Sequence, residues 1–166
     1  MRSVDAILAD MRKLCDELEQ CRITEKRADD SFRGLSEISS RAQRCAVKNH
    51  ALIGCDEHTQ EMYLMILFSV ASLDDNAYSE SLFTIYRIIH GMEYKGDAQA
   101  LWLRAKQINF ETIDECTRLF INSDKKRLLV TECLLIAANF TEGKRKAMKF
   151  IADISSLLCL EKNELT

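Results

Sequence analysis

The sequence predicts an all-α fold: a single compact helical domain of about seven to eight helices, with a repeated helical hairpin inside it. Three observations predict this fold. The 166 residues contain no proline, the residue that most strongly breaks helices. Apolar residues recur at spacings of three and four, and no segment shows sustained alternation of strand-type residues. Hydrophobic residues make up 47% of the chain and charged residues 30%, which is typical of a soluble globular domain with its own core.

Residues 1–50 predict an N-terminal amphipathic helical hairpin or extension. The first apolar seam advances in steps of three and four, and it consists of Val4, Ile7, Met11, Leu14, Leu18 and Cys21. Asp29, Asp30 and Ser31 indicate a break. The amphipathic stretch that follows presents Phe32, Leu35, Ile38, Ala42 and Cys45. We expect this part to form one continuous unit with the helices after it.

Residues 58–166 predict the helical core domain. From His58 the chain becomes apolar nearly all round, through "EMYLMILFSVASL", which indicates a central helix covered by its neighbours. Asp74, Asp75 and Asn76 interrupt the pattern. The next helix then buries Leu82, Ile85, Ile88 and Ile89, with Gly91 as a natural C-cap. Further helices are expected over residues 98–108, 112–121, 124–138 and 144–158.

Two parts of this core domain echo each other. Laying Phe68 on Leu134 aligns "FSVASLDDNAYSESLFTIYRIIHGM" with "LLIAANFTEGKRKAMKFIADISSLL", and we call this alignment the repeat register. The apolar positions agree better than the identities do; Ala71 meets Ala137, Ile85 meets Ile151 and Ile88 meets Ile154. This agreement is what a duplicated helical hairpin leaves behind, and it predicts two equivalent hairpins.

The repeated unit carries a family resemblance. Each unit is an apolar helix, a short turn and a second amphipathic helix; the turns read "DNAYS" (75–79) and "FTEGKR" (140–145). Over residues 58–165 the chain resembles the TerB-like tellurite-resistance domain. The resemblance implies an all-helical domain, acidic metal sites at both turns and a role in stress or phage defence. The departures from the family pattern are Asn76 for the usual Gly, Leu82 where a Glu is expected, and Thr141 or Glu142 in place of an Asp.

Asp74 and Asp75 have two interpretations. A hard cation such as Ca²⁺ or Mg²⁺ takes oxygen ligands, six or more of them for Ca²⁺, and this turn supplies two carboxylates and an Asn amide. Capping of the following helix needs only one side-chain oxygen. Capping is therefore the favoured prediction, and a divalent-cation site is the alternative.

Two histidine-containing segments also have alternatives. Cys45, His50, Cys55 and His58 have the spacing C-x4-H-x4-C-x2-H, four donors of the kind that bind zinc tetrahedrally. The favoured interpretation is a loop with surface histidines and buried cysteines, because reduced cysteine behaves as a small apolar residue. For His90 the favoured interpretation is a histidine at the end of a helix, and a phosphotransfer site is the alternative.

Two surfaces are candidates for binding a partner. One is the N-terminal seam at Ile7, Met11, Leu14 and Leu18, which packs either on its own domain, the favoured prediction, or in a homodimeric coiled coil. The other is a cluster of cations around the start of the last helix, Lys144, Arg145, Lys146 and Lys149. A solvated helix start is the favoured interpretation of this cluster in an acidic protein, and binding of phosphate or of an acidic partner is the alternative.

The function predicted is a non-catalytic helical module that recognises another protein or a second copy of itself. A net charge of -3 disfavours nucleic acid and anionic membranes as partners. The apolar runs are too short to span a membrane, and the lack of a leader predicts a cytoplasmic protein. GxSxG, P-loop and HExxH motifs are missing from the sequence, so we expect no enzyme and no cofactor beyond a divalent cation. The alternative is a protein that binds Ca²⁺, Mg²⁺ or Zn²⁺ or transfers phosphate, centred on Asp74 and Asp75 or on His90.

Overall fold

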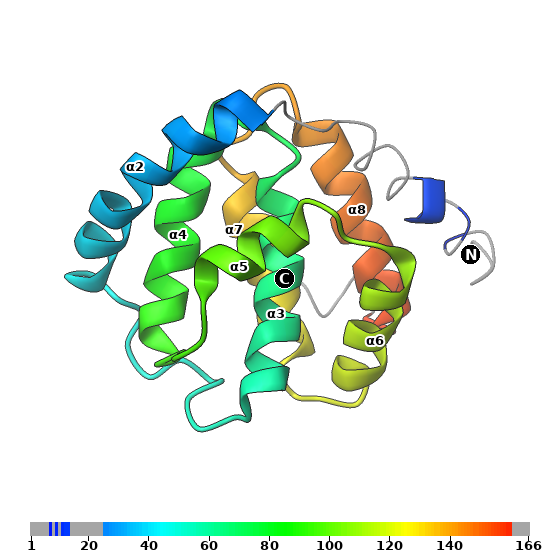
Figure 1. The fold of residues 1–166 in the computed structure, drawn as a ribbon. Coiled ribbons are helices and arrows are strands. Elements are labelled where there is room, and N and C mark those ends of the chain that lie inside the picture. The colour runs from blue at the N-terminus through cyan, green and yellow to red at the C-terminus, as the bar shows by residue number, and fades with distance from the viewer. Residues whose placement is uncertain (1–6, 8, 10, 14–24, 161–166) are drawn as a thin grey trace.

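The computed structural model describes the backbone of residues 7, 9, 11–13 and 25–160, and the side chains of the same residues except 25–33. The all-α prediction is confirmed for these residues (Figure 1). In chain order the elements are α2 (Glu25–Gln43), α3 (Glu57–Ala71), the short 3-10 helix η1 (Asp75–Ala77), α4 (Tyr78–Gly91), α5 (Ala98–Ala105), α6 (Phe110–Phe120), α7 (Lys126–Ala137) and α8 (Lys144–Leu157).

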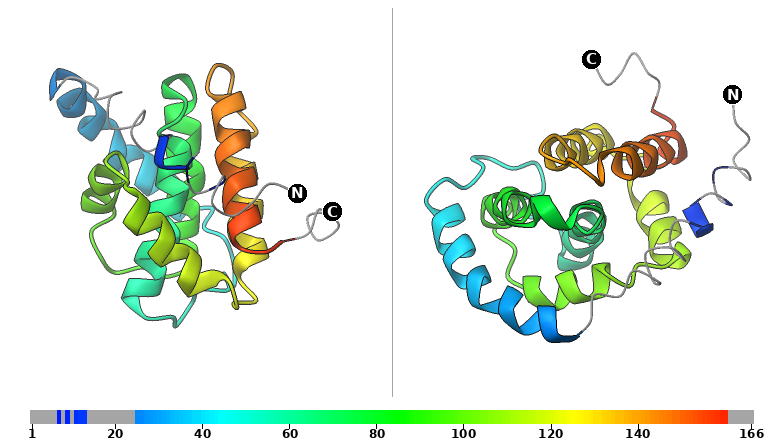
Figure 2. Two further views of the ribbon diagram at one scale, coloured as in Figure 1. Left: turned by 90° about the vertical axis from the view of Figure 1, so that its right-hand side faces the viewer. Right: turned by 90° about the horizontal axis from the view of Figure 1, so that it is seen from above.

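The helices pack in three layers around α3. Seen from above, the α7–α8 hairpin forms one outer layer, α3 and α4 form the middle layer, and α2 and α5 form the other outer layer, with α6 closing one end (Figure 2). The middle helix α3 contacts α4, α5, α6, α7 and α8. Every residue from Met62 to Ala71 is accordingly buried, which confirms the central apolar helix that the sequence predicts.

The sequence repeat is also a repeat of helix boundaries. The repeat register carries the start and end of α4 onto those of α8, and the last residue of α3 onto the last residue of α7. The two C-termini have the same local structure: Glu93 and Cys159 have positive φ angles of 57° and 53°. The next residues, Tyr94 and Leu160, donate their N–H groups to Ile89 and Ser155. Both hairpins therefore end in a Schellman motif at equivalent positions.

Gly91 has a different role from the predicted C-cap. The residue in the left-handed conformation is Glu93, two positions later. A Cβ atom on Gly91 would collide with the backbone oxygen of Val47, and the N–H of Val47 donates to the carbonyl of Arg87 at 3.1 Å. Glycine is needed here because the segment after α2 lies directly against α4.

Helix α2 covers the outer face of α4. It buries Leu35 and Ala42, and the guanidinium of Arg41 lies over the ring of Phe83 at 5.6 Å from its centroid. The break predicted at Asp29, Asp30 and Ser31 is wrong, because α2 runs through these residues without interruption. The predicted N-terminal extension is packed on the core through this helix. No helix in the part of the chain that the structure describes is both long and apolar enough to cross a membrane.

Candidate functional site

Asp74 joins the turns of the two hairpins. Its carboxylate accepts N–H groups from Asn76 at 2.9 Å in its own turn, and from Thr141 at 2.7 Å and Gly143 at 3.1 Å in the second turn. Burial raises the pKa of Asp74, but the backbone N–H donors lower it by more, so that the pKa lies below its ordinary value of 3.8. Asp74 is the N-cap of the short helix η1, whereas the N-cap of α4 is Ala77, which makes no side-chain capping bond. The capping prediction is therefore confirmed for η1 and not for α4.

The second turn fits closely against the first. A Cβ atom on Gly143 would collide with the backbone oxygen of Leu73 and lie 2.7 Å from the Cβ of Asp74. Both oxygens of Asp74 face backbone N–H donors, so most of the lone pairs with which the carboxylate would bind a cation are already used. Asp75 is exposed and does not share this cluster. The two acidic residues therefore have different roles, and the predicted cation site at Asp74 and Asp75 gains no support from their geometry.

The four predicted zinc ligands are not brought together. Cys45 is exposed and donates to the carbonyl of Arg41, and His58 forms a 3.2 Å surface pair with Glu115. Cys55 is half-buried and His50 is buried. This reverses the expected arrangement of surface histidines and buried cysteines at two of the positions. Among the residues that the structure describes, no group of three or more His, Cys, Asp or Glu side chains could hold a metal ion.

His50 belongs to a buried polar network that the sequence pattern does not predict. Its Nδ1 accepts the N–H of Leu52 at 3.2 Å, so the proton of the neutral ring lies on Nε2, which donates to Glu132 at 3.2 Å. The hydroxyl of Tyr63 donates to the same carboxylate at 2.8 Å. Burial, and then the charge of Glu132, raise the pKa of Tyr63 far above its ordinary value. The network links the loop after α2 to α3 and α7, and its signal in the sequence is the single charge of Glu132 within an apolar run.

His90 is held by α2. Its Nε2 lies 3.1 Å from both the hydroxyl and the carbonyl oxygen of Ser39. A bond to the carbonyl requires that Nε2 carry the proton and donate. In that state Nε2 has no lone pair with which to accept a phosphoryl group. The phosphotransfer prediction for His90 gains no support from this position, whereas a role in fixing α2 on α4 does.

The predicted N-terminal partner seam is buried at its described positions. Ile7 is 6% exposed and Met11 is fully buried, so both side chains pack in the protein's own core. They are not an exposed surface for a partner, because their apolar area is already removed from water by the same chain. The other two positions of the seam, Leu14 and Leu18, lie outside the described residues.

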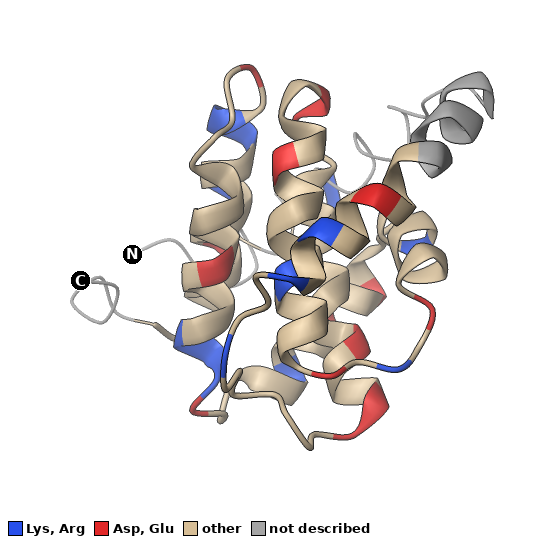
Figure 3. Ribbon diagram, turned by 90° about the vertical axis from the view of Figure 1, so that its left-hand side faces the viewer, with Lys and Arg blue, Asp and Glu red and all other residues tan. Residues whose placement is uncertain are grey.

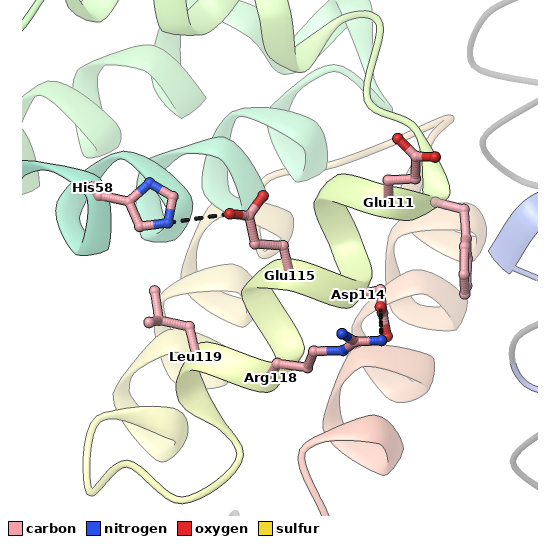
Figure 4. A pocket seen from close by; sticks show the side chains of 7 residues that line it. His58, Glu111, Asp114, Glu115, Arg118 and Leu119 are labelled. Carbon is pink, nitrogen blue, oxygen red and sulfur yellow. Dashed lines mark ion pairs between the residues drawn. The ribbon is translucent and has the colours of Figure 1, made fainter.

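An open pocket of about 600 Å³ lies beside α6 (Figure 4). Its lining residues are His58, Phe110, Glu111, Asp114, Glu115, Arg118 and Leu119. Glu115 pairs with His58, and Asp114 pairs with Arg118 at 2.7 Å. These are exposed pairs, which contribute little to stability. Because two of its three carboxylates are already paired with a neighbour, the pocket does not present a concentrated charge to a ligand.

The two hairpins differ strongly in charge. Acidic and basic residues are spread over most of the helices seen in Figure 3. However, residues 57–91 contain five acidic residues and one basic residue, and residues 126–157 contain six basic and three acidic residues. Of the three acidic residues in the second hairpin, Glu132 and Asp153 are buried, which leaves Glu142 as its exposed carboxylate. The overall charge of -3 therefore conceals a basic surface on the second hairpin.

That basic surface surrounds the start of α8. The predicted cluster Lys144, Arg145, Lys146 and Lys149 is exposed at all four positions. The second hairpin also has two large exposed apolar side chains, Leu135 at 54% and Met148 at 44%. We define the hairpin surface as these six residues.

Three of the cations of α8 lie at its N-terminus, where a positive charge destabilises a helix. Its first turn holds Lys144, Arg145 and Lys146 with no acidic residue, and its N-cap, Gly143, makes no side-chain capping bond. A helix N-terminus carries a partial positive charge, so each cation there is unfavourable by about 0.3–1 kcal/mol. The equivalent turn of α4 holds Glu80, at the position that the repeat places on Lys146. The second hairpin therefore carries its basic residues against its own stability.

Comparisons with known proteins assign no family to the chain. No protein-family profile matches it, and no curated protein or solved structure does either.

Proposed function

We propose that this protein is a non-catalytic helical module that recognises another protein through the hairpin surface. The observation that carries the proposal is the row of three cations, Lys144, Arg145 and Lys146, at the N-terminus of α8, where the helix dipole opposes them. Residues kept at a cost to stability are typical of functional sites.

The exposed apolar residues support the same proposal. Met148 lies on α8 one turn after Lys144, and Leu135 lies on the preceding helix of the hairpin. Interfaces between proteins combine apolar side chains, which lose water on binding, with charged residues around them. Charges of one sign also accelerate the encounter with an oppositely charged partner. The surface therefore has both components that an acidic protein partner would use.

The TerB-like resemblance remains part of the proposal. It is supported by the repeated hairpin, whereas the use of the Asp74 carboxylate by backbone N–H donors does not support the metal site that the resemblance implies at the first turn. A role in stress or defence is what the resemblance implies. The charge and exposure of the hairpin surface support a partner site independently of the resemblance.

The test is affinity capture from cells with the wild-type chain and with Lys144→Glu/Arg145→Glu/Lys146→Glu. The proposal predicts that at least one partner is captured by the wild type and lost by the triple variant, while the variant unfolds at a higher temperature because acidic residues suit a helix N-terminus. Glu80→Lys is the matched control, since it makes the reverse change at the equivalent turn of α4. It should keep the partner and lower the stability slightly. Partners that bind the wild type and the triple variant equally would overturn the proposal.

A further inference from the structure

Among the residues that the structure describes, one hairpin of the repeat carries a covering helix and the other does not. Helix α2 lies on the outer face of α4, and α4 is the counterpart of α8. In the view from above, α2 and the α7–α8 hairpin lie on opposite sides of the molecule (Figure 2). The outer face of α8 is therefore equivalent to a surface that, in the other repeat, is already a helix-packing site.

The equivalent residues can be compared one by one. Phe83 and His90 of α4 contact α2, and Ser79, Leu82 and Tyr86 lie on the same side of α4 by their spacing of three and four. The repeat register places these five residues on Arg145, Met148, Lys149, Ala152 and Ser156. We call the second set the α8 face. Its spacing of three and four puts all five residues on one side of the helix.

The two faces differ in exposure. On α4, Leu82 is fully buried, Tyr86 is 8% exposed, and Phe83 and His90 are half-buried against α2, whereas Ser79 at the start of the helix is exposed. On α8, all five residues of the α8 face are exposed, and Met148 has 44% of its surface open to water. Ala152 in place of Tyr86 leaves a small residue at the centre of the face, and small residues let two helices approach closely. The α8 face thus has the form of a helix-packing site without its helix.

The positive charge of the α8 face indicates which kind of helix would bind there. The α8 face includes Arg145 and Lys149, with Lys144 and Lys146 beside it. An amphipathic helix with acidic flanks would place its apolar residues on Met148 and Ala152 and its carboxylates near the cations. Helix α2 of a second copy does not fit this description, because it contains four acidic and four basic residues and already packs on α4.

We propose that the α8 face is the docking site for an acidic amphipathic helix of a partner protein, bound as α2 is bound on α4. This inference rests on the proposed function and specifies its partner. An anionic lipid surface would satisfy the cations equally well. The packing of α2 on the equivalent face favours a helix.

The experiment is selection of a displayed library of helical peptides, each about five turns long, on the full-length protein. We expect the selected peptides to carry acidic residues beside an apolar stripe. They should bind Ala152→Trp about tenfold more weakly or worse, because the large ring occupies the centre of the α8 face. Ala100→Trp, an equal change at an exposed position of α5, should bind them normally. Amide hydrogen exchange should show protection in α8 on binding.

Three results would overturn the inference. Selected peptides that lack acidic residues, or that bind Ala152→Trp as well as the wild type, would place the partner elsewhere. Binding to phosphatidylserine vesicles that Ala152→Trp abolishes, with no peptide selected, would assign the face to lipid. Sedimentation of the wild type as a dimer, with Ala152→Trp monomeric, would assign it to a second copy.

The inference and the proposed function fail differently. If the triple charge reversal releases cellular partners and the peptide selection fails, only the helix is wrong. If the triple reversal leaves capture unchanged, the hairpin surface itself is wrong.

Discussion

Asp74 illustrates how a residue that looks like an ion ligand in the sequence becomes part of the architecture. Its carboxylate takes the place of a second capping residue, because the turn before α8 has only Gly143 at its N-cap. One buried side chain thereby satisfies N–H groups in its own turn and in a second turn, at Thr141 and Gly143, that is distant in sequence and close in space. Such an arrangement makes each hairpin depend on the other.

Asp74→Asn should lower the free energy of unfolding by about 3 kcal/mol, the upper end of the cost of an unsatisfied buried polar group. The amide keeps one acceptor oxygen, but its NH₂ group would face the N–H groups of Thr141 and Gly143. Urea denaturation measures the difference. Asp75→Asn is the control, and as an exposed change it should stay within about 0.5 kcal/mol of the wild type. Equal effects of the two changes would contradict this role for Asp74.

The lowered pKa of Asp74 also predicts how stability depends on acid. A carboxyl group whose pKa is lower in the folded state stabilises the protein above its unfolded value, which is 3.8, and this contribution is lost as the pH falls through the folded value. Between pH 6 and pH 3, about the range that matters, the wild type should therefore lose more stability than Asp74→Asn does. Parallel denaturation curves of the two proteins over this range would show that Asp74 has no such shift.

At this scale the sequence predicts some roles and misses others. It predicts that Asp74 caps, because a cap needs only a local N–H group. It does not predict the bonds to Thr141 and Gly143, because they join residues distant in sequence. The same reason hides the pair of His50 and Glu132, which are 82 positions apart.

At the scale of elements, the two hairpins are more alike in where their helices start and end than in the residues on the helix surfaces. Both hairpins finish in a Schellman motif with a residue other than glycine, Glu93 or Cys159, in the left-handed conformation. Side chains other than glycine are strained there by about 1–2 kcal/mol. The shared backbone geometry persists although the residues at these positions do not favour it.

Cys159→Gly should accordingly raise the free energy of unfolding by about 0.5–1 kcal/mol, since removal of this strain exceeds the extra entropy that glycine loses on folding. Thermal and urea denaturation under reducing conditions measure the change. Ala152→Gly, in the interior of α8, is the control and should cost about 1 kcal/mol. If Cys159→Gly were as destabilising as Ala152→Gly, the left-handed position would not be strained.

The sequence predicts the elements well because helical periodicity is local. The repeat register was visible from apolar positions alone, and it coincides with the starts and ends of α4 and α8. The role of Gly91 could not be predicted in this way, because the close contact with Val47 depends on where α2 lies. Which helix would be left uncovered depends on the same packing.

At the scale of the whole molecule, the two hairpins of the repeat have different surroundings. The first is acidic, central and covered by α2. The second is basic and peripheral, and its α8 face is exposed. The composition of the whole chain hides this difference, because the two charges nearly cancel. The net charge therefore argues correctly against a globally basic protein, but it says nothing about a basic surface on one hairpin.

The central claim is that the second hairpin binds a protein partner, and site-specific photo-crosslinking in cells tests it most directly. A photoreactive amino acid at Met148 should give a discrete crosslinked partner. The same amino acid at Leu103 of α5 should not, although both side chains are 44% exposed. The Met148 product should also disappear in Lys144→Glu/Arg145→Glu/Lys146→Glu. Crosslinks of equal yield from both positions, or a Met148 product that survives the charge reversal, would contradict the claim.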